Sequence, residues 1–157
     1  MENTRTATPA FDLKSVPFYL EKLNAETKPA WGMMTPQHML EHLGNTLILV
    51  NSKKALPCVT PEEHLPAYRQ FLMSDKPFAQ NIPNQFIGDG LAPLRFENLE
   101  TAKTKLLAAI ESFNNFFREN PEATPMHPFF GNLNHEEWQQ FQRKHFSHHF
   151  RQFGLLA

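Results

Sequence analysis

The sequence predicts an all-α fold, an antiparallel four-helix bundle with a long proline-rich connection between its second and third helices. Apolar residues recur every three or four positions, as on one face of a helix, in four segments: about 11–26, 36–50, 99–119 and 135–153. The alternation typical of strands is missing from the sequence, apart from a weak pattern at Phe86–Ile87. Residues 51–97 hold six of the thirteen prolines, so this stretch is expected to be mostly loop.

The composition limits the class of protein. With 157 residues the chain fits one domain, residues 1–157, and the polar residues 1–10 are expected to be frayed. Lys plus Arg is 15 and Asp plus Glu is 16, and this balance argues against nucleic acid or an anionic membrane as partner. The sequence shows no transmembrane run and no signal peptide, and its single cysteine, Cys58, excludes an intrachain disulfide. We therefore expect a cytoplasmic protein, and its eight histidines raise the question of a metal site.

Capping signals mark the first two helices. Asp12 or Ser15 could cap the first helix, and Thr35, followed directly by a proline, is a favourable N-cap for the second. Along the second helix, His42 falls on an inward-facing row. His38 falls at the third helical position, where a capping residue is usual, and this gives it a structural role. Of these two histidines, His42 is the candidate ligand.

The middle of the chain carries weaker signals. Thr60-Pro61-Glu62-Glu63 predicts a capping box and one short helix that ends at about Met73. A connection as long as residues 51–97 is often a functional wall or lid, but it could equally be a simple crossover. The third helix is expected to stop at Asn120-Pro121, and Asn134 with Glu137 predicts a capping box for the fourth.

The last helix carries the chemistry. At about 100° per residue, one stripe of this helix contains Trp138, Phe141, His145, His149 and Gln152. Two inward imidazoles one turn apart can share a metal ion, and in helical bundles such sites form between facing helices. The alternative is that both are core histidines hydrogen-bonded to neighbouring groups. His148 falls at the edge of the same stripe.

Two segments resemble a known superfamily. Trp31-Gly-Met-Met-Thr-Pro-Gln-His-Met-Leu-Glu-His42-Leu resembles the first motif of the DinB/YfiT-like metal-binding superfamily, and His145-Phe-Ser-His-His149-Phe-Arg151-Gln152 resembles its second. The segments His127-Pro-Phe-Phe-Gly131 and Phe-Arg-Gln-Phe-Gly154 are further similar to an uncharacterised branch of it.

The resemblance implies a fold, a site and an activity. The fold would be an up-down-down-up four-helix bundle, often a homodimer. The site would hold a divalent ion, commonly zinc or nickel, on His42, His145 and His149. Characterised relatives include thiol-dependent S-transferases and a thiol-dependent maleylpyruvate isomerase. Many relatives place the last histidine directly before arginine, whereas here Phe150 intervenes. His148 is therefore an alternative to His149 as the third ligand.

Three neutral histidines with an open fourth position fit a catalytic metal, which could bind water or a substrate thiol. No glutamate follows His145, and the helical wheel turns Glu41 away, so neither provides a general base. Gln152 and Asn45 are expected to hydrogen-bond the ligands rather than to react. For Arg151, simple solvation and the binding of a substrate anion remain equally open.

The remaining candidates are expected to be structural. Cys58 is expected to be a spectator and Trp31 to pack at the bundle end or to wall the metal pocket. His127 is expected to be a loop residue, and His64 and His135 to be exposed.

These observations predict a divalent-metal protein, most plausibly an enzyme of the thiol-dependent S-transferase or hydrolase class that acts on a small molecule, with a low-molecular-weight thiol as co-substrate. The alternative is a non-enzymatic, metal-stabilised helical bundle or an interaction protein.

Overall fold

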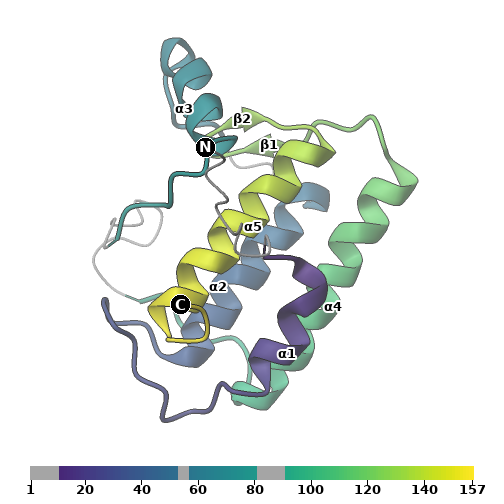
Figure 1. The fold of residues 1–157 in the computed structure, drawn as a ribbon. Helices are drawn as coiled ribbons and strands as arrows, with labels where there is room; N and C mark the ends of the chain where they lie inside the picture. Colours follow the sequence, from purple (N-terminus) through teal and green to yellow (C-terminus); the bar gives the residue numbers. More distant parts are fainter. Residues whose placement is uncertain (1–10, 53–56, 81–90) are drawn as a thin grey trace, which may run out of the picture.

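The computed structural model describes residues 11–52, 57–80 and 91–157, which are mostly helical (Figure 1). The described residues form five α-helices: α1 Val16–Leu20, α2 Pro36–Ile48, α3 Leu65–Leu72, α4 Leu99–Glu119 and α5 His135–Gln152. They also form one two-stranded antiparallel sheet, β1 Met126–His127 and β2 Gly131–Asn132. The expectations for residues 1–10 and for Phe86–Ile87 lie outside the described residues.

Three long helices make the body of the molecule. Helix α2 packs against both α4 and α5, and the short α1 lies against α4 (Figure 1). Their apolar faces meet in one core that includes Leu40, Leu43, Leu106, Phe113, Phe117, Trp138, Phe146 and Phe150. Burial of one such side chain contributes about 1.5–3 kcal/mol relative to its exposure. The mainly helical prediction is confirmed, but with a first helix of five residues the four-helix bundle is not.

The first helix is much shorter than the predicted segment 11–26. Asp12 caps the 3₁₀ turn Leu13–Ser15 that leads into this helix, because its carboxylate accepts a hydrogen bond from the Lys14 amide, whereas the Ser15 side chain makes no capping bond to α1. Helix α1 ends at Leu20 because the next residues form a different turn. The amides of Lys22 and Leu23 donate to carbonyls three residues earlier, and in the turn after them the side chain of Asn24 accepts a hydrogen bond from the Glu26 amide. Asparagine side chains compete in this way with the backbone hydrogen bonds of a helix. The helix predicted from the apolar period was therefore too long.

The long helices were predicted more closely. The Thr35 side chain accepts a hydrogen bond from the His38 amide at the start of α2, and the structure gives α4 the predicted bounds. At the start of α5, the Asn134 side chain accepts from the Glu137 amide and the Glu137 carboxylate accepts from the Asn134 amide. This reciprocal pair confirms the predicted capping box. Gly154 follows α5 with a φ of 72°, as a helix stop requires.

Two local predictions were wrong. The Thr60 hydroxyl does not cap the following helix, because it donates to the Phe129 carbonyl instead, and the short helix begins with a 3₁₀ turn, Glu62–His64. The sequence also gave no β-period for β1 and β2. These strands have only two residues each, too few for alternation to show, and Gly131 adopts a φ of 78° at their turn.

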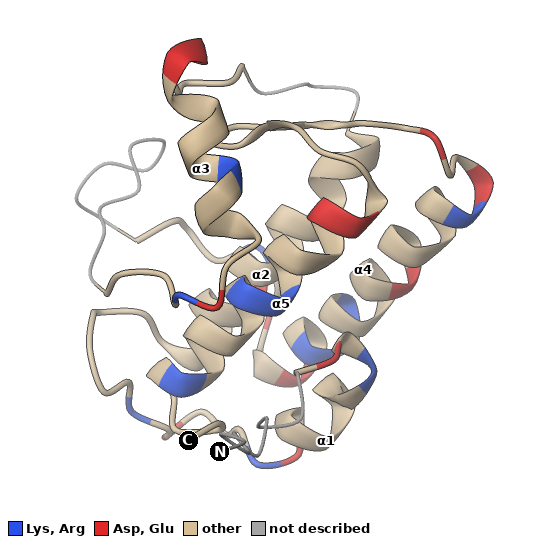
Figure 2. Ribbon diagram, turned by 45° about the horizontal axis from the view of Figure 1, so that its top comes forward, with Lys and Arg blue, Asp and Glu red and all other residues tan. Residues whose placement is uncertain are grey.

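Charged residues of both signs are interspersed along the surface, as the red and blue bands on α4 show (Figure 2). None of the helices in the described part of the chain has the length and apolar character needed to cross a bilayer.

Candidate metal centre

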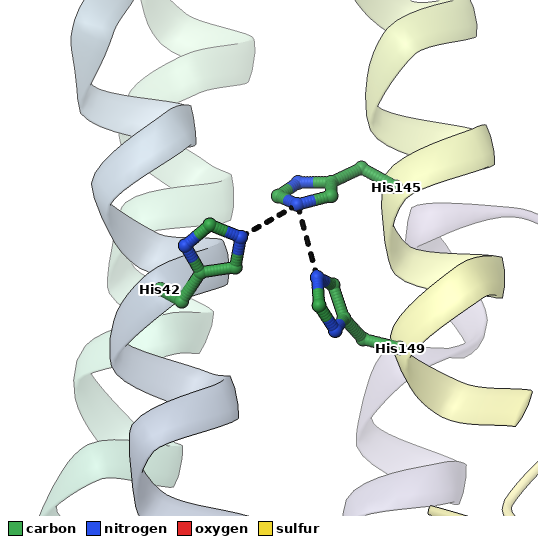
Figure 3. Close-up of side chains that lie close together, drawn as sticks. All are labelled: His42, His145 and His149. Atoms are coloured by element: carbon green, nitrogen blue, oxygen red, sulfur yellow. Dashed lines mark hydrogen bonds between the residues drawn. The ribbon is translucent and has the colours of Figure 1, made fainter. Parts of the chain in front are cut away.

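The three predicted histidines converge between α2 and α5. His42 projects from α2, whereas His145 and His149 project from successive turns of α5 (Figure 3). The Nε2 atom of His145 lies 2.9 Å from Nε2 of His42 and 3.2 Å from Nε2 of His149. Among the described residues, this is the cluster of histidine, cysteine or carboxylate groups that could hold a metal ion. All its ligand atoms lie within 4.8 Å of one another.

The spacing of these nitrogens suits a small divalent ion. Imidazole nitrogens at about 2.0–2.1 Å from a tetrahedral zinc are about 3.3 Å apart, which is the edge of the coordination tetrahedron. Two Nε2 separations, 2.9 and 3.2 Å, are close to that length. The geometry of the triad is therefore compatible with a metal ion.

Hydrogen bonds behind His149 determine which of its nitrogens carries the proton. The Nε2 amide of Gln152 donates to the Trp31 carbonyl at 3.0 Å, so the Oε1 atom of Gln152 must face the other way. Oε1 lies 2.7 Å from Nδ1 of His149, and only a protonated Nδ1 can donate to it. The Nε2 atom of His149 consequently presents a lone pair to the centre of the triad.

Hydrogen bonds also fix the tautomer of His145. The Thr46 hydroxyl lies 2.8 Å from the Leu43 carbonyl, to which it donates, and 3.2 Å from the Oε1 atom of Gln142. Its oxygen is then an acceptor for Nδ1 of His145, at 3.4 Å. The Nε2 atom of His145 therefore also presents a lone pair inward. Two lone pairs facing each other at this distance repel, and a cation between them removes the repulsion.

Burial keeps the triad neutral. Burial, and to a smaller extent repulsion from the neighbouring His148, lower the pKa of His42 to about 4. Burial lowers the pKa of His149 to about 3, partly opposed by its hydrogen bond to Gln152. The pKa of His145 falls well below its usual value, first through burial and then through repulsion from the other two rings. All three imidazoles are thus in the neutral form that binds metal ions.

Aromatic residues surround the triad on the side of His148. His148 is half-buried, and its ring contacts those of His149, Trp31 and Phe78, with centroids 4.9, 5.5 and 6.2 Å apart. The Phe78 ring also contacts His145, at 6.3 Å. His148 is not a member of the converging cluster, so the geometry favours His149 as the third histidine.

The structure separates most other candidates from the triad. Glu41 is buried but is not part of the triad cluster, because its carboxylate accepts hydrogen bonds from the amides of Arg95 and Phe96. Gln152 contacts a triad histidine as expected, whereas Asn45 is exposed. Arg151 is also exposed, on the solvent face. Cys58 is half-buried and its thiol points to the Thr60 carbonyl, so it does not join the triad.

The other histidines differ from expectation in two cases. His64 is exposed, as predicted. His127 lies in β1 rather than a loop and is 3% exposed, and its Nδ1 atom accepts from the amides of Phe129 and Phe130. His135 is not exposed, because its ring stacks on Phe117 at 4.4 Å. Both rings complete the aromatic core.

Sequence reasoning missed two polar contributors to the site. Thr46 faces inward one turn after His42, and this polar interruption of an apolar row was a usable signal. Gln142 is fully buried and donates to the Thr46 carbonyl, and a glutamine on the inward side of α5 was a second signal. The contribution of Phe78 could not be inferred, because no periodicity fixes the position of a loop residue.

Comparison with known proteins places the chain in a family. Residues 59–154, more than half of the chain, match the model of a family described as a protein of unknown function, DUF1569. The chain belongs to the DUF1569 family. The match includes His145 and His149 of this DUF1569 protein but starts after α2, so it does not include His42. Neither a curated protein nor a solved structure matches the chain.

Two hollows in the described structure lie away from the triad. They measure about 450 and 350 Å³ and open along α4, the larger beside Asn51 and the smaller beside Leu13. No histidine of the triad lines either hollow.

Proposed function

We propose that this DUF1569 protein binds a divalent ion, zinc or nickel, through His42, His145 and His149, and that it is a metal-dependent enzyme acting on a small molecule. The observation that carries the proposal is the inward convergence of neutral imidazole nitrogens, two of them fixed as acceptors by Thr46 and Gln152. Structural zinc sites normally use four protein ligands, so three histidines favour an ion with a free position.

The reaction class we propose is thiol-dependent S-transfer, with hydrolysis as the second option. A bound ion would act as a Lewis acid that stabilises a thiolate or a hydroxide at neutral pH. The chain's own residues would orient the ligands: Gln152 holds the ring of His149, and Thr46 holds the ring of His145. A low-molecular-weight thiol would be the co-substrate.

The proposal extends to the superfamily. The order of Trp31, the Thr35 cap, His42 and the pair His145 and His149 supports membership of the DinB/YfiT-like superfamily. Membership would make the arrangement of α1, α2, α4 and α5 an up-down-down-up four-helix bundle. It would also make a homodimer the expected form of the protein. A cytoplasmic location and a single domain remain part of the proposal, on the single cysteine and the length of the chain.

Elemental analysis of freshly purified protein tests the metal site. We expect about one equivalent of zinc or nickel per chain, and its loss in a His145→Ala variant. A His64→Ala variant is the matched control, because that histidine is exposed and should leave the metal content unchanged. Metal-free wild-type protein, prepared with both ions available, would refute the proposal.

A non-enzymatic, metal-stabilised bundle is the second candidate. The burial of His145 and His149, each 7% exposed, favours it. Cobalt substitution separates the two candidates, since the cobalt spectrum changes when an added thiol coordinates. A thiol-dependent spectrum supports the enzyme, whereas an unresponsive spectrum together with a large fall in melting temperature on chelation supports the structural role.

A further inference from the structure

The chain that follows α3 lies against the metal-binding face of α5. The Phe78 ring contacts Phe141, His145 and His148, with centroids 6.0, 6.3 and 6.2 Å away. These three residues form one stripe of α5, spaced four and three positions apart. Phe78 therefore covers a ligand histidine from the side of the half-buried His148.

Two side chains of α5 fasten the end of α3 in this position. The Lys144 ammonium donates to the carbonyls of Phe71 and Ser74, at 2.7 and 3.2 Å. The Gln140 amide donates to the Leu72 carbonyl at 3.1 Å. The Phe71 carbonyl also accepts from the Ser74 amide and hydroxyl, at 3.1 and 2.6 Å, so Lys144 adds a further donor there. Gln140 supplies a partner for the Leu72 carbonyl at the end of α3, where helical carbonyls have no partner within the helix.

The Lys144 ammonium also makes cation–π contacts with two aromatic rings, those of Phe71 and Phe78. The ammonium lies 4.0 Å from the centroid of the Phe71 ring and 5.5 Å from that of Phe78. The two rings are in turn 5.9 Å apart. The cation is thus held between two aromatic rings and two carbonyls, and it precedes the ligand His145 directly in the sequence.

We propose that Phe78 is the wall that limits access to the metal of the triad, and that Lys144 is the positioning residue that holds this wall in place. The inference rests on the proposed function, because it assumes an ion on the three histidines. It assigns a role to the end of α3 and the residues that follow it: the rate at which a chelator or a small ligand reaches the ion depends on release of residues 71–78 from α5. Equilibrium occupancy depends on the histidines themselves.

The rate of metal removal by an excess of a chromogenic chelator tests this assignment on the full chain. Phe78→Ala removes the wall, and Lys144→Met removes the donor while keeping an unbranched apolar stem against the rings. We expect both variants to bind one equivalent of metal and to release it about tenfold faster than wild type. Lys103→Met is the matched control. Lys103 lies on α4, and its ammonium also donates to a backbone carbonyl, that of Leu23, at 2.7 Å. The release rate of this variant should stay within about twofold of wild type.

The outcomes separate the two levels of the proposal. Wild-type release rates in both test variants, with full metal content, would overturn the wall while leaving the metal site intact. Faster release from Phe78→Ala alone would overturn the role of Lys144. Wild-type protein without metal would overturn the proposed function and this inference together.

Discussion

Acidification should destabilise the metal-free protein through His127, a buried histidine outside the triad. This ring is 3% exposed, and its Nδ1 atom already accepts hydrogen bonds from the amides of Phe129 and Phe130. Protonation of Nδ1 would bury a positive charge. It would also turn Nδ1 from an acceptor into a donor that faces the N–H groups of Phe129 and Phe130. Burial accordingly lowers the pKa of His127 from 6.5 to about 3.

The sign and size of the effect follow from proton linkage. Because the folded-state pKa is lower than the unfolded one, the histidine costs no stability above pH 6.5, and its penalty grows as the pH falls from there towards 3. At about pH 5 the unfolded chain is protonated at this site and the folded chain is not, which lowers the free energy of unfolding by about 2 kcal/mol. The value at that pH requires only that the folded pKa be well below 5.

Urea unfolding of chelator-treated protein at about pH 7.5 and about pH 5 measures this effect. The reference is a His127→Asn variant, whose Oδ1 atom can accept the same two amide hydrogen bonds but does not titrate. Between the two pH values, the free energy of unfolding should fall by about 2 kcal/mol less in the variant than in wild type. The contributions of the triad histidines are the same in both proteins and cancel in this comparison. Equal losses in the two proteins would refute the reasoning.

Three further outcomes are expected. Gln152→Leu should weaken metal binding about 10- to 100-fold in a chelator competition, because His149 loses its acceptor; unchanged affinity would contradict the role of Gln152 in fixing the tautomer. Asn134→Ala should lower the free energy of unfolding by about 1 kcal/mol through loss of the capping box, without changing metal content. Glu41→Leu should lower the free energy of unfolding by about 1–3 kcal/mol, because the amide of Arg95 loses its hydrogen-bond acceptor. An unchanged urea midpoint would contradict this, and would show that solvent replaces the carboxylate.

The sequence was a good guide wherever local rules decide the structure. The bounds of α4 follow from a regular apolar period and a stop at Asn120, and the capping box of α5 follows from two residues three positions apart. The inward direction of His42, His145 and His149 follows from the helical wheel. That they meet required the packing of α2 on α5, and the superfamily resemblance anticipated it.

Errors arose where distant groups compete for a side chain. The Thr60 hydroxyl would cap the next helix by local rules, but the Phe129 carbonyl, far along the chain, takes its hydrogen bond. His127 was expected in a loop, and its burial depends on Trp138 and Phe141 of α5, whose rings lie 5.1 and 4.2 Å away. Neither contact has a signature in the sequence around the residue concerned.

The hydrogen bonds around Gln152 suggest why a loop before α2 contributes to a site on α5. The Ala30 amide donates to the Gln152 carbonyl at 2.7 Å, and the Gln152 side chain donates to the Trp31 carbonyl at 3.0 Å. The loop therefore holds Gln152 at both its backbone and its side chain. It thereby fixes the direction of the amide oxygen that accepts from His149. The carbonyl group of Trp31 acts on His149 through Gln152, while the ring of Trp31 packs against His148. A change in loop geometry should consequently disturb the tautomer of His149 more than a change of the tryptophan ring.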